Sequence, residues 1–175
     1  MAINWTKDQP AVVFLRQQVG VFFPAVGLHY DAMMTVRPRA RHTVRDHPSL
    51  GVGGHVSRTT EGGGPSLHAE GRAADIYVKI QNAYLKAIGD ALFTGFVANA
   101  AQLHLEEVIW NGQMWTASVP RLHAIPAGRN QHTDHVHVGF TRPGSQHHSP
   151  LLITVLRDAR TTVEVQFAAP APAGP

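Results

Sequence analysis

Histidines and carboxylates gather in two short stretches of this chain, and their types are those of a hydrolytic metal site. The first stretch runs from Ser66 to Asp75 and contains His68. The second, Asp134 to His137, lies much further along the chain. Catalytic zinc takes three protein ligands from His, Asp or Glu and keeps a fourth position for water. The two stretches together supply enough such groups, whereas neither would suffice alone.

The spacing within each stretch favours convergence on one point. Gly71 and Ala73 are small residues that let backbone and ligands crowd together. His135 and His137 are two residues apart in a β-rich segment, so both imidazoles point to the same face of a strand. Asp134 precedes them directly, and a carboxylate beside an imidazole can orient it or act as a base toward water.

The composition limits which residue types could hold a metal ion. The 175 residues are enough for one domain with a buried core, and a hydrophobic content of 43% is ordinary for a globular protein. The absence of cysteine excludes disulfides, thiolate zinc sites and a cysteine nucleophile. Any metal must therefore be held by histidine and carboxylate, and the 12 histidines equal the 12 acidic residues in number.

Charge and hydropathy indicate which partners to expect. The net charge is only +3, and the densest basic run, from Arg37 to Arg45, is interpreted as a solvated loop, with an anionic polymer surface as the alternative. No basic and aromatic module is present, so we expect no nucleic-acid partner. Lys7, Asp8 and Arg16 interrupt the N-terminal apolar runs, and no segment approaches the roughly twenty apolar residues of a membrane span. We therefore expect neither a signal peptide nor a membrane partner.

Apolar periodicity and turn residues predict the elements that must position these groups. Two segments have helical periodicity: 9–19 and, after an N-cap at Asn82, 83–103. The remaining segments have strand character, with an Asn-Gly hairpin in the third of them: 54–58, 73–80, 107–115, 135–140 and one or two strands within 151–167.

This order of elements indicates an α+β fold with a small, mostly antiparallel sheet and flanking helices. We expect one domain over residues 1–167 and a disordered Ala/Pro tail over residues 168–175. Trp110 and Trp115, on either side of the hairpin turn, are expected to pack in the core.

The first stretch resembles a known family signature. Ser66-x-His68-x-x-Gly71-x-Ala73-x-Asp75 matches the Ser-x-His-x-x-Gly-x-Ala-x-Asp pattern of the D-alanyl-D-alanine metallopeptidases. These enzymes belong to a superfamily with lysostaphin-type endopeptidases and the hedgehog signalling domain. The similarity extends over roughly residues 50–140. It implies a hedgehog/D-Ala-D-Ala-peptidase-like fold and a bound Zn²⁺.

The second stretch supplies the rest of the implied zinc site. The family has an acidic residue three positions before its last zinc histidine, and Asp134-x-x-His137 is similar. The resemblance therefore implies that His68, Asp75 and His137 bind zinc and that Asp134 is the catalytic base. The lysostaphin side of the superfamily instead has a His-x-His pair whose first histidine is catalytic, which would make His135 the base. Asp134 is preferred, and the other residue would stabilise the oxyanion.

Further residues are assigned around this centre. The family carries an arginine upstream of the first zinc histidine that holds the substrate, and Arg58 is the candidate here, with Ser66 as a second substrate-binding residue. Many family members have Glu where this chain has Asp134. His132 is a candidate for an outer contact to the site, and Glu70 is expected to face solvent.

The resemblance implies a zinc metallopeptidase that hydrolyses peptidoglycan stem peptides, as a D,D- or L,D-type carboxypeptidase or as an endolysin-like endopeptidase. A non-catalytic, zinc-containing cell-wall-binding module of the same fold is the alternative. A histidine phosphoesterase is a third, with only His147-His148-Ser149 to support it. Such an enzyme would act on peptidoglycan or muropeptides at the cell wall or periplasm. Since no signal peptide is expected, phage lysis or a secretion machine would bring the enzyme there, or the chain would be a domain excised from a larger protein.

Overall fold

The computed structural model describes residues 5, 7–23, 52–53 and 66–168. Several sequence predictions fall outside these residues: the basic run from Arg37 to Arg45, the strand at 54–58, the candidate Arg58, and positions 169–175 of the tail. Everything below concerns the described residues.

A six-stranded sheet forms the centre of the fold, with strand order β1-β2-β6-β3-β4-β5 and antiparallel pairing between all neighbours. Its strands are β1 (Val52–Gly53), β2 (Ala73–Tyr77), β3 (Leu105–Trp110), β4 (Gln113–Thr116), β5 (Val119–Ala124) and β6 (His135–Phe140). The hairpin between β3 and β4 turns at Asn111 and Gly112, whose φ angles of 46° and 77° are those of the predicted Asn-Gly turn. The fold is therefore α+β with an antiparallel sheet, as predicted.

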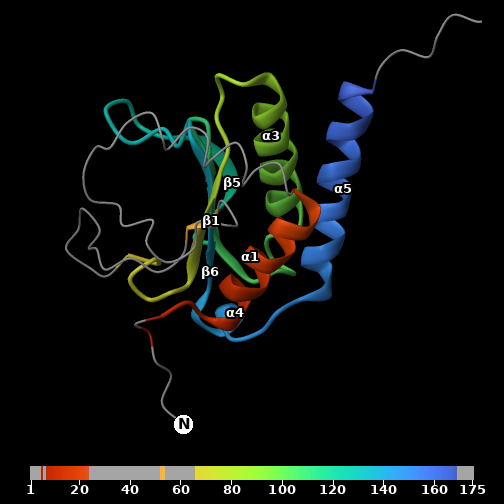
Figure 1. Ribbon diagram of the computed structural model, residues 1–175. Helices are drawn as coiled ribbons and strands as arrows, with labels where there is room; N and C mark the ends of the chain where they lie inside the picture. Colours follow the sequence, from red (N-terminus) through yellow and green to blue (C-terminus); the bar gives the residue numbers. More distant parts are fainter. Residues whose placement is uncertain (1–4, 6, 24–51, 54–65, 169–175) are drawn as a thin grey trace, which may run out of the picture.

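The helices lie together on one side of this sheet (Figure 1). They are α1 (Pro10–Phe22), α3 (Ala83–Ala98), α4 (Arg142–Ser145) and α5 (Pro150–Phe167). Helix α3 begins where predicted, because the Asn82 side chain accepts a hydrogen bond from the Leu85 N–H at 3.0 Å. None of the described helices is long and apolar enough to cross a membrane.

The prediction of strands within 151–167 was wrong. This segment forms α5, which begins with Ser149 as N-cap and Pro150 in the first turn. Its buried residues recur at helical spacing: Leu152, Val155, Leu156, Ala159 and Val163. The alternation of β-branched residues that suggested a strand covers only the last turns of the helix, where Val165 and Phe167 are exposed.

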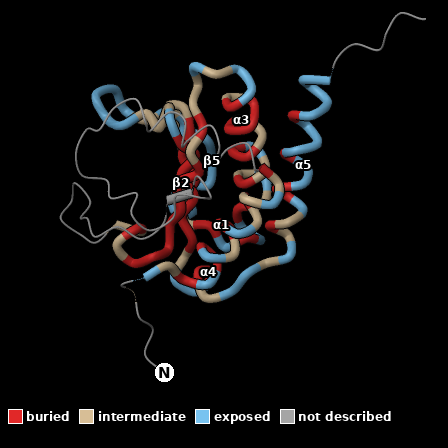
Figure 2. The backbone as a smooth tube through the Cα atoms, viewed as in Figure 1, coloured by how far each residue is buried: buried red, intermediate tan, exposed pale blue. Residues whose placement is uncertain are grey.

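The core lies between the sheet and the helices. Figure 2 shows buried residues along the central strands and on the inner sides of the helices, while the outer side of α5 is exposed. On β6 the core side chains are Val136, Val138 and Phe140, so the alternating residues point to the other face of the sheet, away from the described helices. Trp110 is buried in the core as predicted, and its ring packs closely on α3 at Gly89.

Candidate metal centre

A tight turn ahead of β2 brings His68 to the face of the sheet opposite the described helices. The Ser66 hydroxyl accepts a hydrogen bond from the Ala69 N–H at 3.1 Å and so caps this turn. The turn ends at Gly71, whose φ of 65° lies in the left-handed region. A Cβ at Gly71 would also lie 1.9 Å from the Lys7 carbonyl oxygen, so only glycine fits here.

Strands β2 and β6 hold the other two candidate ligands directly opposite each other. Asp75 pairs with His137 in the antiparallel register, which places both side chains on the same face. Their neighbours Ala74 and Val138 point into the core instead. The alternation of residues along the two paired strands thus places both candidate ligands on the same face of the sheet.

The three candidate ligands converge. His68 Nε2 lies 3.1 Å from Asp75 Oδ1 and 3.1 Å from His137 Nδ1, and His137 Nδ1 lies 2.9 Å from Asp75 Oδ1. All three residues are buried. Two imidazole nitrogens and one carboxylate oxygen on one point form a group that could bind a metal ion.

His135 lies beside this group on the same face of β6. Its Nδ1 donates a hydrogen bond to Asp134 Oδ1 at 2.7 Å, and its Nε2 lies 3.6 Å from Asp75 Oδ1. The Asp134 side chain is 61% exposed and points to His135 from the rim of the site. The hydrogen bond from His135 is the main reason that the pKa of Asp134 is lowered, with burial acting in the opposite direction. Asp134 thus orients the imidazole, and the other ring nitrogen is the one directed at the centre.

Glu107 is a carboxylate of the site that the sequence interpretation missed. Its Oε1 accepts a hydrogen bond from His137 Nε2 at 3.0 Å, on the side of the ring away from Asp75. Burial acts to lower the pKa of His137, but the hydrogen bonds to Asp75 and Glu107 outweigh it and raise that pKa to about 9. Burial also acts to raise the pKa of Asp75, yet its hydrogen bonds with His137 and His68 hold it well below the usual range. From the sequence, Glu107 was placed only in a predicted strand, because no local pattern connects it with His137, which lies 30 residues further along the chain.

Comparison with known families matches residues 27–137 to the family described as VldE, C-terminal domain. This match covers more than half of the chain. The chain belongs to the VldE C-terminal domain family. The matched region contains all three candidate ligands and Glu107, and it ends at His137, so that α1 and α5 lie outside it. No curated protein and no solved structure matched the chain.

Membership of the VldE C-terminal domain family does not by itself specify a reaction, so the remaining residues are judged by their position. His132, the candidate for an outer contact, lies with its ring centroid 4.7 Å from that of His135 and 6.0 Å from that of His137. Burial and the neighbouring His135 and His137 lower the pKa of His132 to about 4, so it is neutral at physiological pH. Arg58, the candidate substrate ligand, lies outside the described residues.

The expectation that Glu70 faces solvent was wrong. Glu70 is buried and accepts hydrogen bonds from Arg72 at 2.6 Å and from Arg142 at 2.5 Å. Arg72 is buried as well, and it also donates to Glu106 and to the backbone carbonyl of Phe140. This network ties the turn that carries His68 to the ends of β3 and β6, and Arg142 lies too far along the chain for sequence spacing to reveal it.

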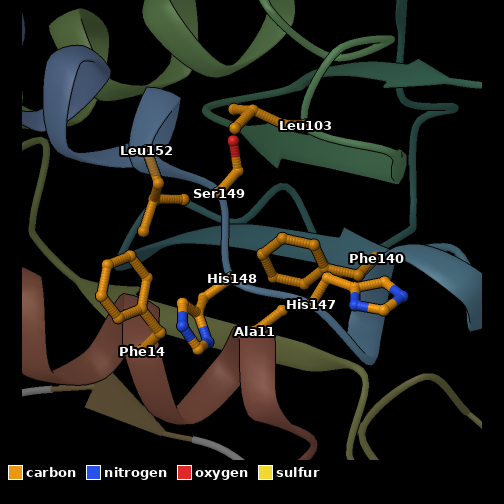
Figure 3. A pocket seen from close by; sticks show the side chains of 8 residues that line it. All are labelled: Ala11, Phe14, Leu103, Phe140, His147, His148, Ser149 and Leu152. Atoms are coloured by element: carbon orange, nitrogen blue, oxygen red, sulfur yellow. The ribbon is translucent and has the colours of Figure 1, made fainter.

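A small pocket lies between α1, the end of β6 and the start of α5 (Figure 3). Its lining includes Phe14, Phe140, His147, His148 and Ser149, and the rings of Phe14 and His148 lie with their centroids 4.9 Å apart and their planes tilted by 33°. The cavity measures about 10 Å³, which is room for one water molecule. It is therefore too small for a substrate, and the His-His-Ser segment considered for phosphoester chemistry lies beside a packing gap.

Proposed function

We propose that this protein is a zinc-dependent peptidase that hydrolyses peptidoglycan stem peptides. The observation that carries this proposal is the convergence of His68, Asp75 and His137 beside a histidine that a carboxylate orients. The resemblance of the first stretch to the D-alanyl-D-alanine metallopeptidase signature supports the reaction class and the substrate class.

The donor set fits zinc. Tetrahedral zinc has Zn–N bonds of about 2.0–2.1 Å and Zn–O bonds of about 2.0–2.2 Å, which places ligand atoms roughly 3.4 Å apart. The separations of 2.9–3.1 Å between the three donor atoms are close to that value. Two imidazoles and one carboxylate are also a common protein set for catalytic zinc. Zinc bound here would lower the pKa of a water molecule and polarise the amide carbonyl.

His135 is the base in this proposal, and Asp134 orients it. The hydrogen bond to Asp134 places a proton on Nδ1 of His135 and leaves the lone pair of Nε2 directed at the centre. Nε2 then takes a proton from the attacking water and passes it to the leaving amine nitrogen as the C–N bond breaks. This assignment reverses the preference drawn from the sequence for Asp134 as the base. The Asp134 carboxylate is exposed at the rim of the site and already accepts a hydrogen bond from His135.

Exchange of each member of this pair separates their roles. His135→Ala should lower kcat by about 10²–10⁴-fold, the usual contribution of a positioned general base. Asp134→Asn should lower kcat less, because the amide oxygen can still accept the Nδ1–H of His135. Both variants should bind zinc as the wild type does. A larger loss of kcat in Asp134→Asn than in His135→Ala would instead make Asp134 the base.

Metal analysis paired with digestion of purified muropeptides tests the proposal as a whole. We expect one zinc per chain and peptide cleavage that His68→Ala abolishes, with mass spectrometry of the products identifying the bond that is cut. Release of a terminal D-residue would define a carboxypeptidase, and cleavage of an internal bond of the stem peptide would define an endopeptidase. A wild-type protein that takes up no zinc would overturn the proposal. Zinc binding without any hydrolysis would favour the non-catalytic cell-wall-binding module.

A further inference from the structure

A carboxylate on a third strand accepts a hydrogen bond from His137, one of the three candidate ligands. Glu107 lies on β3, whereas the three candidate ligands come from the turn at His68 and from β2 and β6. In the register of β3 and β6, Glu107 is opposite Gly139, two residues beyond His137 on the same face of the sheet. Its carboxylate reaches along this face to His137 Nε2 at 3.0 Å.

A bulge in β3 and a glycine on β6 make this contact possible. The register between β3 and β6 shifts between Leu105 and Glu107, so that Leu105 points into the core while Glu107 points to the site. Such bulges commonly redirect a side chain next to a functional site. A Cβ at Gly139 would lie 3.1 Å from Glu107 Cγ and 2.3 Å from Leu67 Cδ1. The absence of a side chain at Gly139 thus leaves room for the Glu107 stem.

We propose that Glu107 is a positioning residue that fixes the proton of His137 on Nε2 and so presents Nδ1 to the metal. This inference rests on the proposed zinc site and extends it to a residue outside the three candidate ligands. A metal-binding histidine ordinarily donates its other ring N–H to a carboxylate or carbonyl, which sets the tautomer and the ring orientation. Here Nδ1 is the atom that lies near both His68 Nε2 and Asp75 Oδ1, and Nε2 is the atom that Glu107 binds.

A pair of variants of similar shape separates hydrogen bonding from packing. Glu107→Gln keeps an acceptor oxygen, whereas Glu107→Met fills similar space with no comparable acceptor. We expect E107M to weaken zinc binding by about 10–100-fold, the usual effect of losing such a partner. E107Q should weaken it by only a few fold. Zinc affinity is measured by competition with a chromophoric chelator, with the exposed Glu164→Ala on α5 as a control that should match the wild type.

An NMR signal provides a readout independent of activity and of overall affinity. In the zinc-loaded wild type the Nε2 proton of His137 should appear as a slowly exchanging imidazole resonance. It should persist in E107Q and be lost or exchange rapidly in E107M. Should E107M not fold, Glu107→Ala carries the same expectation without filling the space.

The outcomes distinguish this inference from the proposed function. A wild-type protein that binds no zinc removes the zinc site itself. A wild type that binds zinc, together with an E107M or E107A variant that binds it equally well and keeps the Nε2 proton signal, overturns the role of Glu107 and leaves the zinc site intact.

Discussion

At the scale of single residues, the candidate metal centre brings a carboxylate and an imidazole of opposite charge into contact. Asp75 is a buried carboxylate with a pKa held well below the usual range, and His137 is a buried imidazole with a pKa raised to about 9. At neutral pH His137 therefore carries a proton that contacts the Asp75 carboxylate through Nδ1. Because this same nitrogen is a candidate ligand atom, zinc can bind only when the proton leaves.

Zinc binding should consequently depend on pH. Between about pH 7 and pH 9 the protonated form of His137 dominates in the metal-free protein, so each pH unit should raise the apparent zinc affinity by roughly tenfold. Above about pH 9 the proton is already gone, and this contribution should level off. Calorimetry in buffers of different ionisation enthalpy should show release of about one proton at pH 7.5. An affinity independent of pH across this range would contradict the assignment of His137 Nδ1 as a ligand atom.

The residues of the centre differ in how well the sequence could predict them. His135 and His137 share a face because they are two apart in a strand, and the structure places them so. The convergence of His68 with Asp75 followed from a motif whose Gly71 adopts the left-handed conformation. Glu107 could not be found in this way, because its contact with His137 depends on the pairing of β3 with β6 and on a bulge between them.

At the scale of elements, the turn of residues 66–71 is the part of the site with the least regular support. Two contacts secure it against the N-terminal segment. The Gln9 N–H donates to the Gly71 carbonyl at 2.9 Å, and the Gly71 Cα faces the Lys7 carbonyl without room for a Cβ. The position of His68 therefore depends on a segment far from the centre in sequence.

Gly71→Ala should be strongly destabilising. The left-handed conformation costs about 1–2 kcal/mol for alanine, and overpacking against Lys7 adds typically 1–3 kcal/mol. Gly128→Ala is the matched control, because Gly128 has a φ of 84° and nothing within 4 Å of an added Cβ. Urea unfolding of the metal-free proteins should show a larger loss for G71A than for G128A, and G71A should also bind zinc more weakly. Equal losses of stability would mean that the contact with Lys7 is unimportant.

Helices and strands were predictable where one local signal dominated. Asn82 caps α3, and the Asn-Gly pair turns the hairpin. Helix α5 was predicted as strands because Thr161, Val163 and Val165 alternate and are β-branched. Only Val163 of these is buried, and the helical register is instead set by packing of the earlier turns against α3 and α1. Intrinsic propensity was overridden by tertiary packing, which a local pattern does not contain.

At the scale of the whole molecule, the two faces of the sheet carry different sets of side chains. The described helices lie on one side of the sheet (Figure 1) and pack the apolar core against it. The candidate ligands Asp75 and His137 alternate with core residues on β2 and β6 and therefore point to the opposite face. The two sets of side chains alternate along the same strands, as Val136 and His137 do on β6. Among the described residues, α5 packs on α3 and α1 and contributes none of the candidate ligands.

Leu156→Ala on α5 should therefore destabilise the protein without changing the metal centre. Leu156 is fully buried, and truncation of such a residue costs about 2–5 kcal/mol. The midpoint of urea unfolding should fall accordingly, while zinc affinity and the His137 Nε2 proton signal should match those of the wild type under conditions in which the variant is folded. The exposed Val165→Ala on the same helix is the control and should change neither quantity. A folded L156A variant with weakened zinc binding would show that the helical layer is coupled to the site through the sheet.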